Sequence, residues 1–146
     1  MCGCGGRGCF ETMVSGKRIL RSAKNKIERH RGRSALKKAA PAALTIQTGF
    51  EASDKGDALA QEVVDEAANW FAIGASNLVL AYDPEIIVLQ GIFAEAGDYF
   101  IRQLRRKINE VSLVHIRKNV QIEYSRFGRD AGVLGAAAYV IAEYLK

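Results

Sequence analysis

The sequence of 146 residues contains no run of about eighteen apolar residues, the length that a transmembrane helix requires. Its first residues are mainly glycine and cysteine, not a basic stretch followed by an apolar one, so they do not resemble a signal peptide. Because both kinds of segment are absent, we expect a cytoplasmic protein with no membrane partner.

Cysteine is also scarce, and Cys2, Cys4 and Cys9 fall in one short segment interleaved with glycines. An odd cysteine count at this spacing does not suit a disulfide framework, whereas reduced thiolates can bind a metal. Three thiolates this close can hold one tetrahedral zinc ion, and glycine permits the tight turns required. No fourth cysteine exists, and His30, the nearest histidine, is interpreted as a surface residue. Free cysteines or an adventitious disulfide are the alternatives to a metal.

Positive charge is concentrated in residues 17–38, where Glu28 is the single acid. Ile19, Leu20 and Ile27 recur there at helical spacing and predict a helix with a narrow apolar seam. No aromatic residue interrupts this basic stretch, and no helix-turn-helix pattern surrounds it. A solvated basic helix is the simpler interpretation, and a surface for nucleic acid or acidic lipid is the alternative.

Helical and strand patterns alternate along the rest of the chain. The long helix has apolar residues at three- and four-residue steps, which is typical of a helix that faces a core. The alternation predicts an α/β fold with a parallel pair of strands. The predicted helices cover residues 10–15, 17–29, 58–81, 96–111 and 130–145, and the predicted strands cover residues 86–89 and 120–124.

Several details of these elements are predictions about packing. The β-branched run at 85–89 predicts a strand buried on both faces. Gly74, inside the long helix, costs about 1 kcal/mol relative to alanine, which indicates close approach of another backbone or a nucleotide. Small residues early in the last helix predict tight packing. Residues 45–53 are interpreted as a connector, and Asp54 or Asp57 as the cap of the long helix.

The cysteine segment follows the pattern Cys-x-Cys-Gly-x-x-Gly-Cys-x-Glu and ends at Glu11. This pattern resembles the zinc motif of the ROK family (repressors, open reading frames and kinases), and residues 77–89, 94–100 and 130–137 resemble later segments of that family in the same order. ROK proteins include sugar kinases and sugar-sensing transcriptional regulators. The resemblance implies a partial actin/hexokinase-like (ribonuclease H-like) α/β fold, namely its C-terminal lobe with a cysteine-rich zinc loop at the start.

The resemblance also implies how the chain is organised. Residues 1–146 would form the C-terminal part of a ROK domain, truncated relative to the whole protein. Within it, residues 1–16 would be the zinc loop and a short helix, residues 17–53 a basic helix and connector, and residues 54–146 the α/β core. The N-terminal lobe and any DNA-binding domain would be absent.

The resemblance further implies roles for individual residues. In ROK proteins, three cysteines at the positions of Cys2, Cys4 and Cys9 share zinc with a histidine about ten residues upstream. That histidine is absent, so we expect an incomplete zinc site. The glutamate at the position of Glu11 hydrogen-bonds a sugar hydroxyl, as a carboxylate acceptor can. On physical grounds alone, the simpler role for Glu11 is to favour the dipole of a helix N-terminus.

ROK kinases carry a phosphate loop and a catalytic aspartate in their N-terminal half, and neither occurs here, so we assign no catalytic residue. These kinases also end one strand with a run of three glycines, where this chain has Gln90, Gly91 and Ile92. We therefore expect the sugar-sensing portion of a ROK regulator, not catalytic alone. Its effector would be a sugar or sugar phosphate, and DNA would be bound only through the absent domain. A ROK sugar kinase portion and a small basic nucleic-acid-binding module are the alternatives.

Two strands cannot cover the apolar faces of three helices, and they leave unpaired backbone edges that attract other chains. We therefore expect a homodimer, with the helices at 58–81 and 130–145 as the main contributors.

Overall fold

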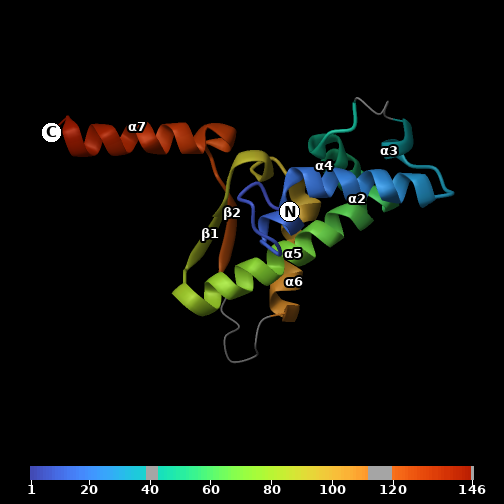
Figure 1. The fold of residues 1–146 in the computed structure, drawn as a ribbon, viewed down its shortest axis with the longest axis horizontal. Helices are drawn as coiled ribbons and strands as arrows, with labels where there is room; N and C mark the ends of the chain where they lie inside the picture. Colours follow the sequence, from blue (N-terminus) through green and yellow to red (C-terminus); the bar gives the residue numbers. More distant parts are fainter. Residues whose placement is uncertain (39–42, 112–119, 146) are drawn as a thin grey trace.

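The computed structural model describes residues 1–38, 43–111 and 120–145, and Figure 1 shows how their helices and strands are arranged. No helix in these ranges is long and apolar enough to cross a membrane. In chain order, the elements are α1 (Glu11–Val14), α2 (Gly16–Arg29), α3 (Ala35–Lys38), α4 (Ile46–Asp54), α5 (Ala58–Tyr82), β1 (Ile86–Leu89), η1 (Gly91–Phe93), α6 (Gly97–Val111), β2 (Gln121–Tyr124), η3 (Gly128–Asp130) and α7 (Ala131–Tyr144). The predicted helices and strands are all present, within a few residues of their expected bounds.

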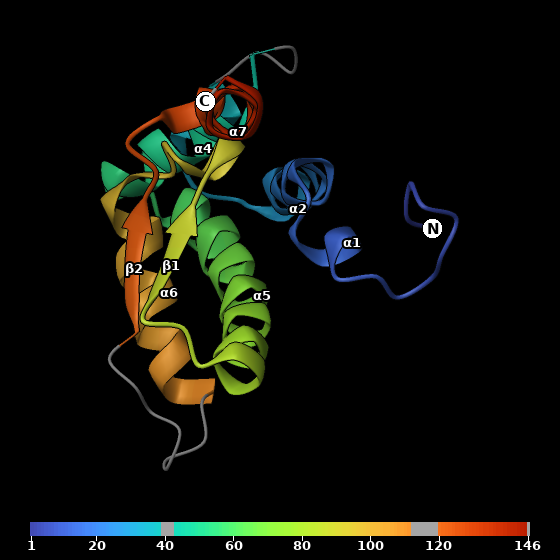
Figure 2. The same cartoon turned by 90° about the vertical axis from the view of Figure 1, so that its left-hand side faces the viewer.

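The two strands β1 and β2 pair in parallel, as predicted, and α5 and α6 lie along one side of them (Figure 2). Leu89 of β1 and Ile122 of β2 are buried beneath these helices. Ile86 and Val88 remain 46% and 52% exposed, because successive side chains of a strand point to opposite faces. The prediction that β1 is buried on both faces is therefore wrong for the described residues, which cover one face only.

Small side chains on α5 allow its neighbours to pack closely. Ala60, Ala68 and Ala72 have no exposed surface, and α4 and α6 both contact this helix. Four aromatic rings fill the space that remains, with centroids 4.5–6.1 Å apart in mostly edge-on or tilted pairs. The four rings belong to Phe50, Phe71, Phe93 and Phe100.

Residues 45–53, interpreted as a connector, instead form most of helix α4. Thr45 and Thr48 close a capping box: the Thr48 N–H donates to Thr45 Oγ1 at 3.1 Å, and the Thr45 N–H donates to Thr48 Oγ1 at 3.0 Å. The usual sequence signature has glutamate or glutamine at the second of these positions, so threonine there concealed the helix start. Phe50 of α4, only 1% exposed, shows that this segment belongs to the core.

Both candidate cap residues cap a helix, but different ones. Asp57 accepts the Ala60 N–H at the start of α5 at 2.9 Å, and it also accepts the Ala35 N–H of α3 at 2.6 Å. Partial burial raises the pKa of the Asp57 carboxyl, but these N–H groups outweigh burial and leave the pKa below its ordinary value. Asp54 accepts the Tyr99 N–H at 2.7 Å and so caps α6.

Helix α7 extends away from the other elements (Figure 1), and none of its residues is buried. A Cβ atom added at Gly132 or Gly135 would meet no atom within 4 Å. The prediction that these small residues pack tightly is therefore not met within the described chain, where α7 meets chiefly the short turn η3 that leads into it.

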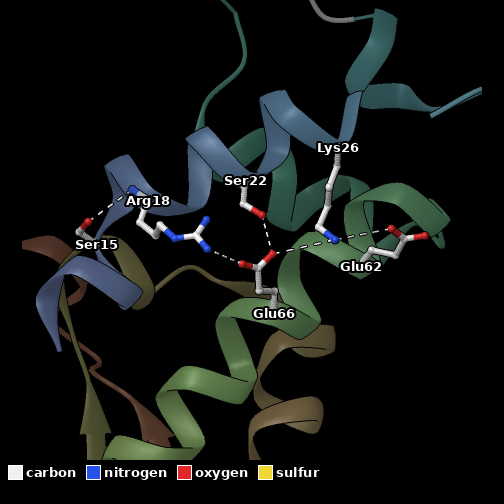
Figure 3. Close-up of polar contacts among 6 residues, drawn as sticks. All are labelled: Ser15, Arg18, Ser22, Lys26, Glu62 and Glu66. Carbon is white, nitrogen blue, oxygen red and sulfur yellow. Dashed lines mark hydrogen bonds and ion pairs between the residues drawn. The ribbon is translucent and has the colours of Figure 1, made fainter. Parts of the chain in front are cut away.

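Helix α2 is joined to α5 by a polar cluster around Glu66, shown in Figure 3. The Glu66 carboxylate accepts from Arg18 Nη2 at 2.8 Å and from Ser22 Oγ at 2.5 Å, and Lys26 Nζ lies 3.9 Å away. Ile19, Ser22 and Ala23 are buried along the same interface. The apolar seam predicted for this helix thus packs on α5, and some of its cations are ion-paired there.

The first prediction concerns this cluster. Glu66→Gln removes the charge that Arg18, Ser22 and Lys26 share, and should lower the free energy of unfolding by about 1–2 kcal/mol. Urea denaturation followed by circular dichroism measures the loss. Glu62→Gln is the matched control on the same helix, because Glu62 makes one 3.8 Å ion pair and is 59% exposed. Equal losses in the two variants would show that the cluster does not hold α2.

Candidate functional site

The segment before α1 folds into a tight loop that brings the three cysteines together. The Cys2 N–H donates to the Gly6 carbonyl and the Gly5 N–H donates to the Cys2 carbonyl, each at 3.0 Å. Gly5 and Gly8 have φ values of 82° and 74°, in the left-handed region that favours glycine. The glycines therefore play the part in the turns that the sequence predicts for them.

The sulfur atoms of Cys2, Cys4 and Cys9 all lie within 4.8 Å of one another. The Cys4 and Cys9 Sγ atoms are 3.6 Å apart, close to the roughly 3.8 Å expected between two thiolates on a tetrahedral ion with Zn–S bonds of about 2.3 Å. The donor set therefore fits three corners of a site for a thiophilic metal. Within the described residues no fourth ligand joins this cluster, and His30 lies at the opposite end of α2.

The three thiols are free, and hydrogen bonds shift the pKa values of Cys4 and Cys9 in opposite directions. The Gly6 N–H and, to a lesser extent, the neighbouring thiols of Cys2 and Cys9 lower the pKa of the Cys4 thiol. Hydrogen bonding to Cys4 and Cys2 raises the pKa of Cys9. A cluster of this kind shares protons among its members, and a bound cation would displace them.

Glu11 is the first residue of α1, and its side chain is exposed. The turn before it is fixed by Thr12, whose Oγ1 and N–H donate to the Cys9 carbonyl at 2.6 and 2.9 Å. Glu11 and the cysteine loop line one open cleft of roughly 830 Å³, together with Arg18 and Arg21 of α2. The cleft thus offers a carboxylate acceptor and cationic donors to a ligand with hydroxyl groups.

Phe10 attaches this loop to the core, a contact that sequence reasoning missed. A Cβ atom on Gly74 would lie 2.4 Å from Phe10 Cζ, so a larger residue there would push the ring from its present position. Phe10 also meets Phe71 edge-on, with ring centroids 6.4 Å apart. Gly74 therefore admits an aromatic side chain, not the backbone or nucleotide that was predicted. The one available signal was an aromatic residue beside the last cysteine.

The turn after β1 holds a single glycine in a special conformation. Gly91 has a φ of 66°, and a Cβ added there would meet nothing within 4 Å. Its neighbours both carry side chains: Gln90 is exposed, and Ile92 is 40% exposed. In this turn the positive φ favours glycine at position 91, whereas positions 90 and 92 carry side chains.

The chain matches the ROK family model over residues 1–143, and it therefore belongs to the ROK family. A glucokinase from Halalkalibacterium halodurans is 33% identical over 135 residues, which cover 92% of this chain and 41% of that protein. A xylose repressor from Caldicellulosiruptor bescii is 28% identical over 145 residues, which cover 99% of this chain and 36% of that protein. The chain thus spans less than half the length of either relative.

Solved structures show the same pair of classes. A ROK family glucokinase from Streptomyces griseus, crystallised with glucose and AMPPNP, matches with a TM-score of 0.84 and 25% identity, over 94% of this chain and 46% of that one. A ROK family transcriptional regulator, a homologue of the E. coli MLC protein, matches with a TM-score of 0.77 and 26% identity, over 93% and 34% of the two chains. The family resemblance and the α/β fold are confirmed.

The second prediction concerns the cysteine cluster. The chain should bind Co²⁺ or Zn²⁺ through its three thiolates, and Cys4→Ser should weaken binding at least tenfold, because two thiolates remain. Thiolate-to-cobalt absorption followed by zinc competition measures the affinity. Arg7→Ala, in the same loop, should change it little. Tight binding that survives Cys4→Ser would contradict the assignment.

Proposed function

We propose that this chain is the C-terminal, sugar-sensing part of a ROK-family transcriptional regulator. The observation that carries this proposal is the turn after β1. ROK kinases have a glycine run there, through which a nucleotide approaches the backbone. Here Gly91 is flanked by the side chains of Gln90 and Ile92, which would crowd such an approach. The match to a xylose repressor over 99% of the chain gives further support.

The second candidate is the corresponding part of a ROK sugar kinase. Its support is the 33% identity to a glucokinase and the close structural match to another. Phosphoryl transfer needs a base for the sugar hydroxyl and a phosphate cradle. In ROK kinases these belong to the N-terminal half. We therefore propose that residues 1–146 have no catalytic activity by themselves under either candidate.

In the whole protein, zinc on Cys2, Cys4 and Cys9 would fix the turn that presents Glu11, with a fourth ligand from elsewhere. Glu11 would then accept a hydrogen bond from a sugar hydroxyl. Sugar binding alters DNA affinity only if one arrangement of the protein binds the sugar better than another. The cleft lies between the cysteine loop and the start of α2, so a change in loop position would reach it directly. DNA would be bound by a domain outside this chain.

The third prediction separates the two candidates. The complete reading frame, with whatever sequence precedes Met1, should shift its own promoter DNA in a gel assay and lose or gain affinity with one sugar of a hexose and pentose panel. It should show no ATP-dependent phosphorylation of that panel in a coupled assay. Robust phosphorylation without a sugar-dependent shift would instead establish the kinase.

Glu11→Gln tests the sugar contact within the same assay. Losing a hydrogen bond to a charged acceptor costs about 1.5–3 kcal/mol, so the variant should need about 10- to 100-fold more sugar for the same response. Its DNA affinity without sugar should not change. Glu143→Gln, on the exposed helix α7, is the control and should respond like the parent protein.

We further propose that this chain self-associates as a two-fold dimer through α7 and the end of α5. Large apolar side chains of α7 are exposed, including Val133 at 74% and Ile141 at 58%. At the end of α5, Leu80 and Tyr82 are 59% and 77% exposed. Exposed apolar patches of this kind are typical of surfaces that meet a partner.

The fourth prediction follows from that proposal. Light scattering at low micromolar concentration should give the mass of a dimer for the parent chain. Ile141→Glu should shift it toward the monomer, because a buried unpaired charge opposes association. Glu143→Gln should remain dimeric. A parent chain that stays monomeric and unfolds cooperatively would exclude the dimer.

A further inference from the structure

The cations of residues 17–38 divide into an inner and an outer set. Arg18 and Lys26 face α5 and pair with Glu66, and Lys26 also lies near Glu62. The outer set is exposed, and within the described residues none of its members has an ion-pair partner. The outer set comprises Lys17, Arg21, Lys24, Arg29, Arg31, Arg33, Lys37 and Lys38, and Lys37 donates to the His30 carbonyl.

Helix geometry aligns part of this outer set. Lys17, Arg21 and Lys24 are spaced at four and three residues, so they lie one above another on a single side of α2. At about 1.5 Å per residue, the three cover about 10 Å. Glu28 continues the same side and is the one acid on it. The stripe therefore keeps a strong excess of positive charge.

Two exposed acids lie close to this stripe: Glu28 continues it, and Glu11 lines one cleft with Lys17 and Arg21. The acids of α5 and its N-cap are committed elsewhere. Glu62 and Glu66 face the inner cations (Figure 3), and Asp57 accepts hydrogen bonds from Ser34 and from the Ala35 N–H. The segment thus turns its acid-paired side inward and its unpaired cations outward. An outward surface of this charge fits a polyanion.

The stripe lacks exposed apolar side chains and a series of aromatic rings, and these absences indicate which polyanion it suits. The apolar residues Ile19 and Ala23 of α2 are buried against the core, so the helix has no apolar face left to enter a lipid surface. Phe, Tyr and Trp do not occur between residues 17 and 38, and His30 carries the one ring there. The segment therefore has no series of rings on which the bases of a single strand could stack. A nucleic-acid duplex fits better than an acidic lipid surface, because duplex phosphates carry one charge per roughly 1.7 Å of axis and are bound by charge alone, whereas lipid binding is strengthened by an apolar face that this helix does not expose.

We propose that the outer face of α2 and α3, with the segment between them, contacts the phosphate backbone of duplex DNA without sequence preference. This contact belongs to the chain itself and adds to any DNA-binding domain outside it. It does not depend on whether the whole protein is a regulator or a kinase. The basic helix would then be a second, weaker anchor on DNA, not the solvated surface that the sequence favours.

The test uses the full chain and a labelled 30-base-pair duplex of arbitrary sequence, followed by fluorescence anisotropy between 50 and 200 mM salt. We expect dissociation constants that rise steeply with salt, in the range of about 10⁻⁴–10⁻⁶ M at physiological salt. Arg21→Glu with Lys24→Glu should weaken binding at 50 mM salt at least tenfold. The slope of the logarithm of the association constant against the logarithm of the salt concentration should become shallower by about 2, one for each lost phosphate contact.

A charge-matched control separates the effect of this surface on binding from the effect of the net charge of the chain. Arg102→Glu with Arg126→Glu makes the same change in net charge on exposed residues of α6 and of the turn after β2, and should weaken binding less than threefold. Arg21→Gln with Lys24→Gln should give an intermediate loss, with an unchanged melting temperature. Equal losses in the two reversal pairs would overturn the proposal. So would the absence of duplex binding, or tighter binding to phosphatidylserine vesicles than to the duplex.

Discussion

Close packing on α5 is the constraint on which the other elements depend. Ala60, Ala68 and Ala72 expose no surface, and such short side chains let α4 and α6 approach the helix axis. Gly74, two residues after Ala72, serves the same purpose on another side of the helix, because the missing Cβ leaves space for the Phe10 ring. The same helix therefore sets the core and the position of the cysteine loop. Larger side chains at these positions would displace one or the other.

The charge pattern of the chain follows from where α5 carries its acids. Glu62 and Glu66 face α2 and take up Arg18 and Lys26, so the polar interface is balanced. The remaining cations of α2 and α3 then face outward together. A net charge of +5 for the whole chain hides this division, because acids outside the basic segment offset its charge in the sum.

Apolar surface is left uncovered at one side of the described structure. Ile86 and Val88 are exposed on the outer face of β1, and α7 extends from the body with no residue buried. The chain spans less than half the length of its ROK relatives, and surfaces of this kind are where further protein is expected to pack. The cysteine loop and Glu11 lie on other elements, where they line a cleft with the start of α2.

The sequence by itself determined the ROK family, the α/β alternation, the parallel pair of strands and the cysteine cluster, because periodicity and motif spacing are local properties of a chain. Helix α4 was not predicted from the sequence, because the capping pair of Thr45 and Thr48 departs from the usual signature. Only tertiary structure decided that Phe10 occupies the space beside Gly74 and that one face of β1 is exposed. It alone also decided which cations are paired. Each of these depends on elements distant in sequence, and no local pattern records which side chain will arrive from elsewhere.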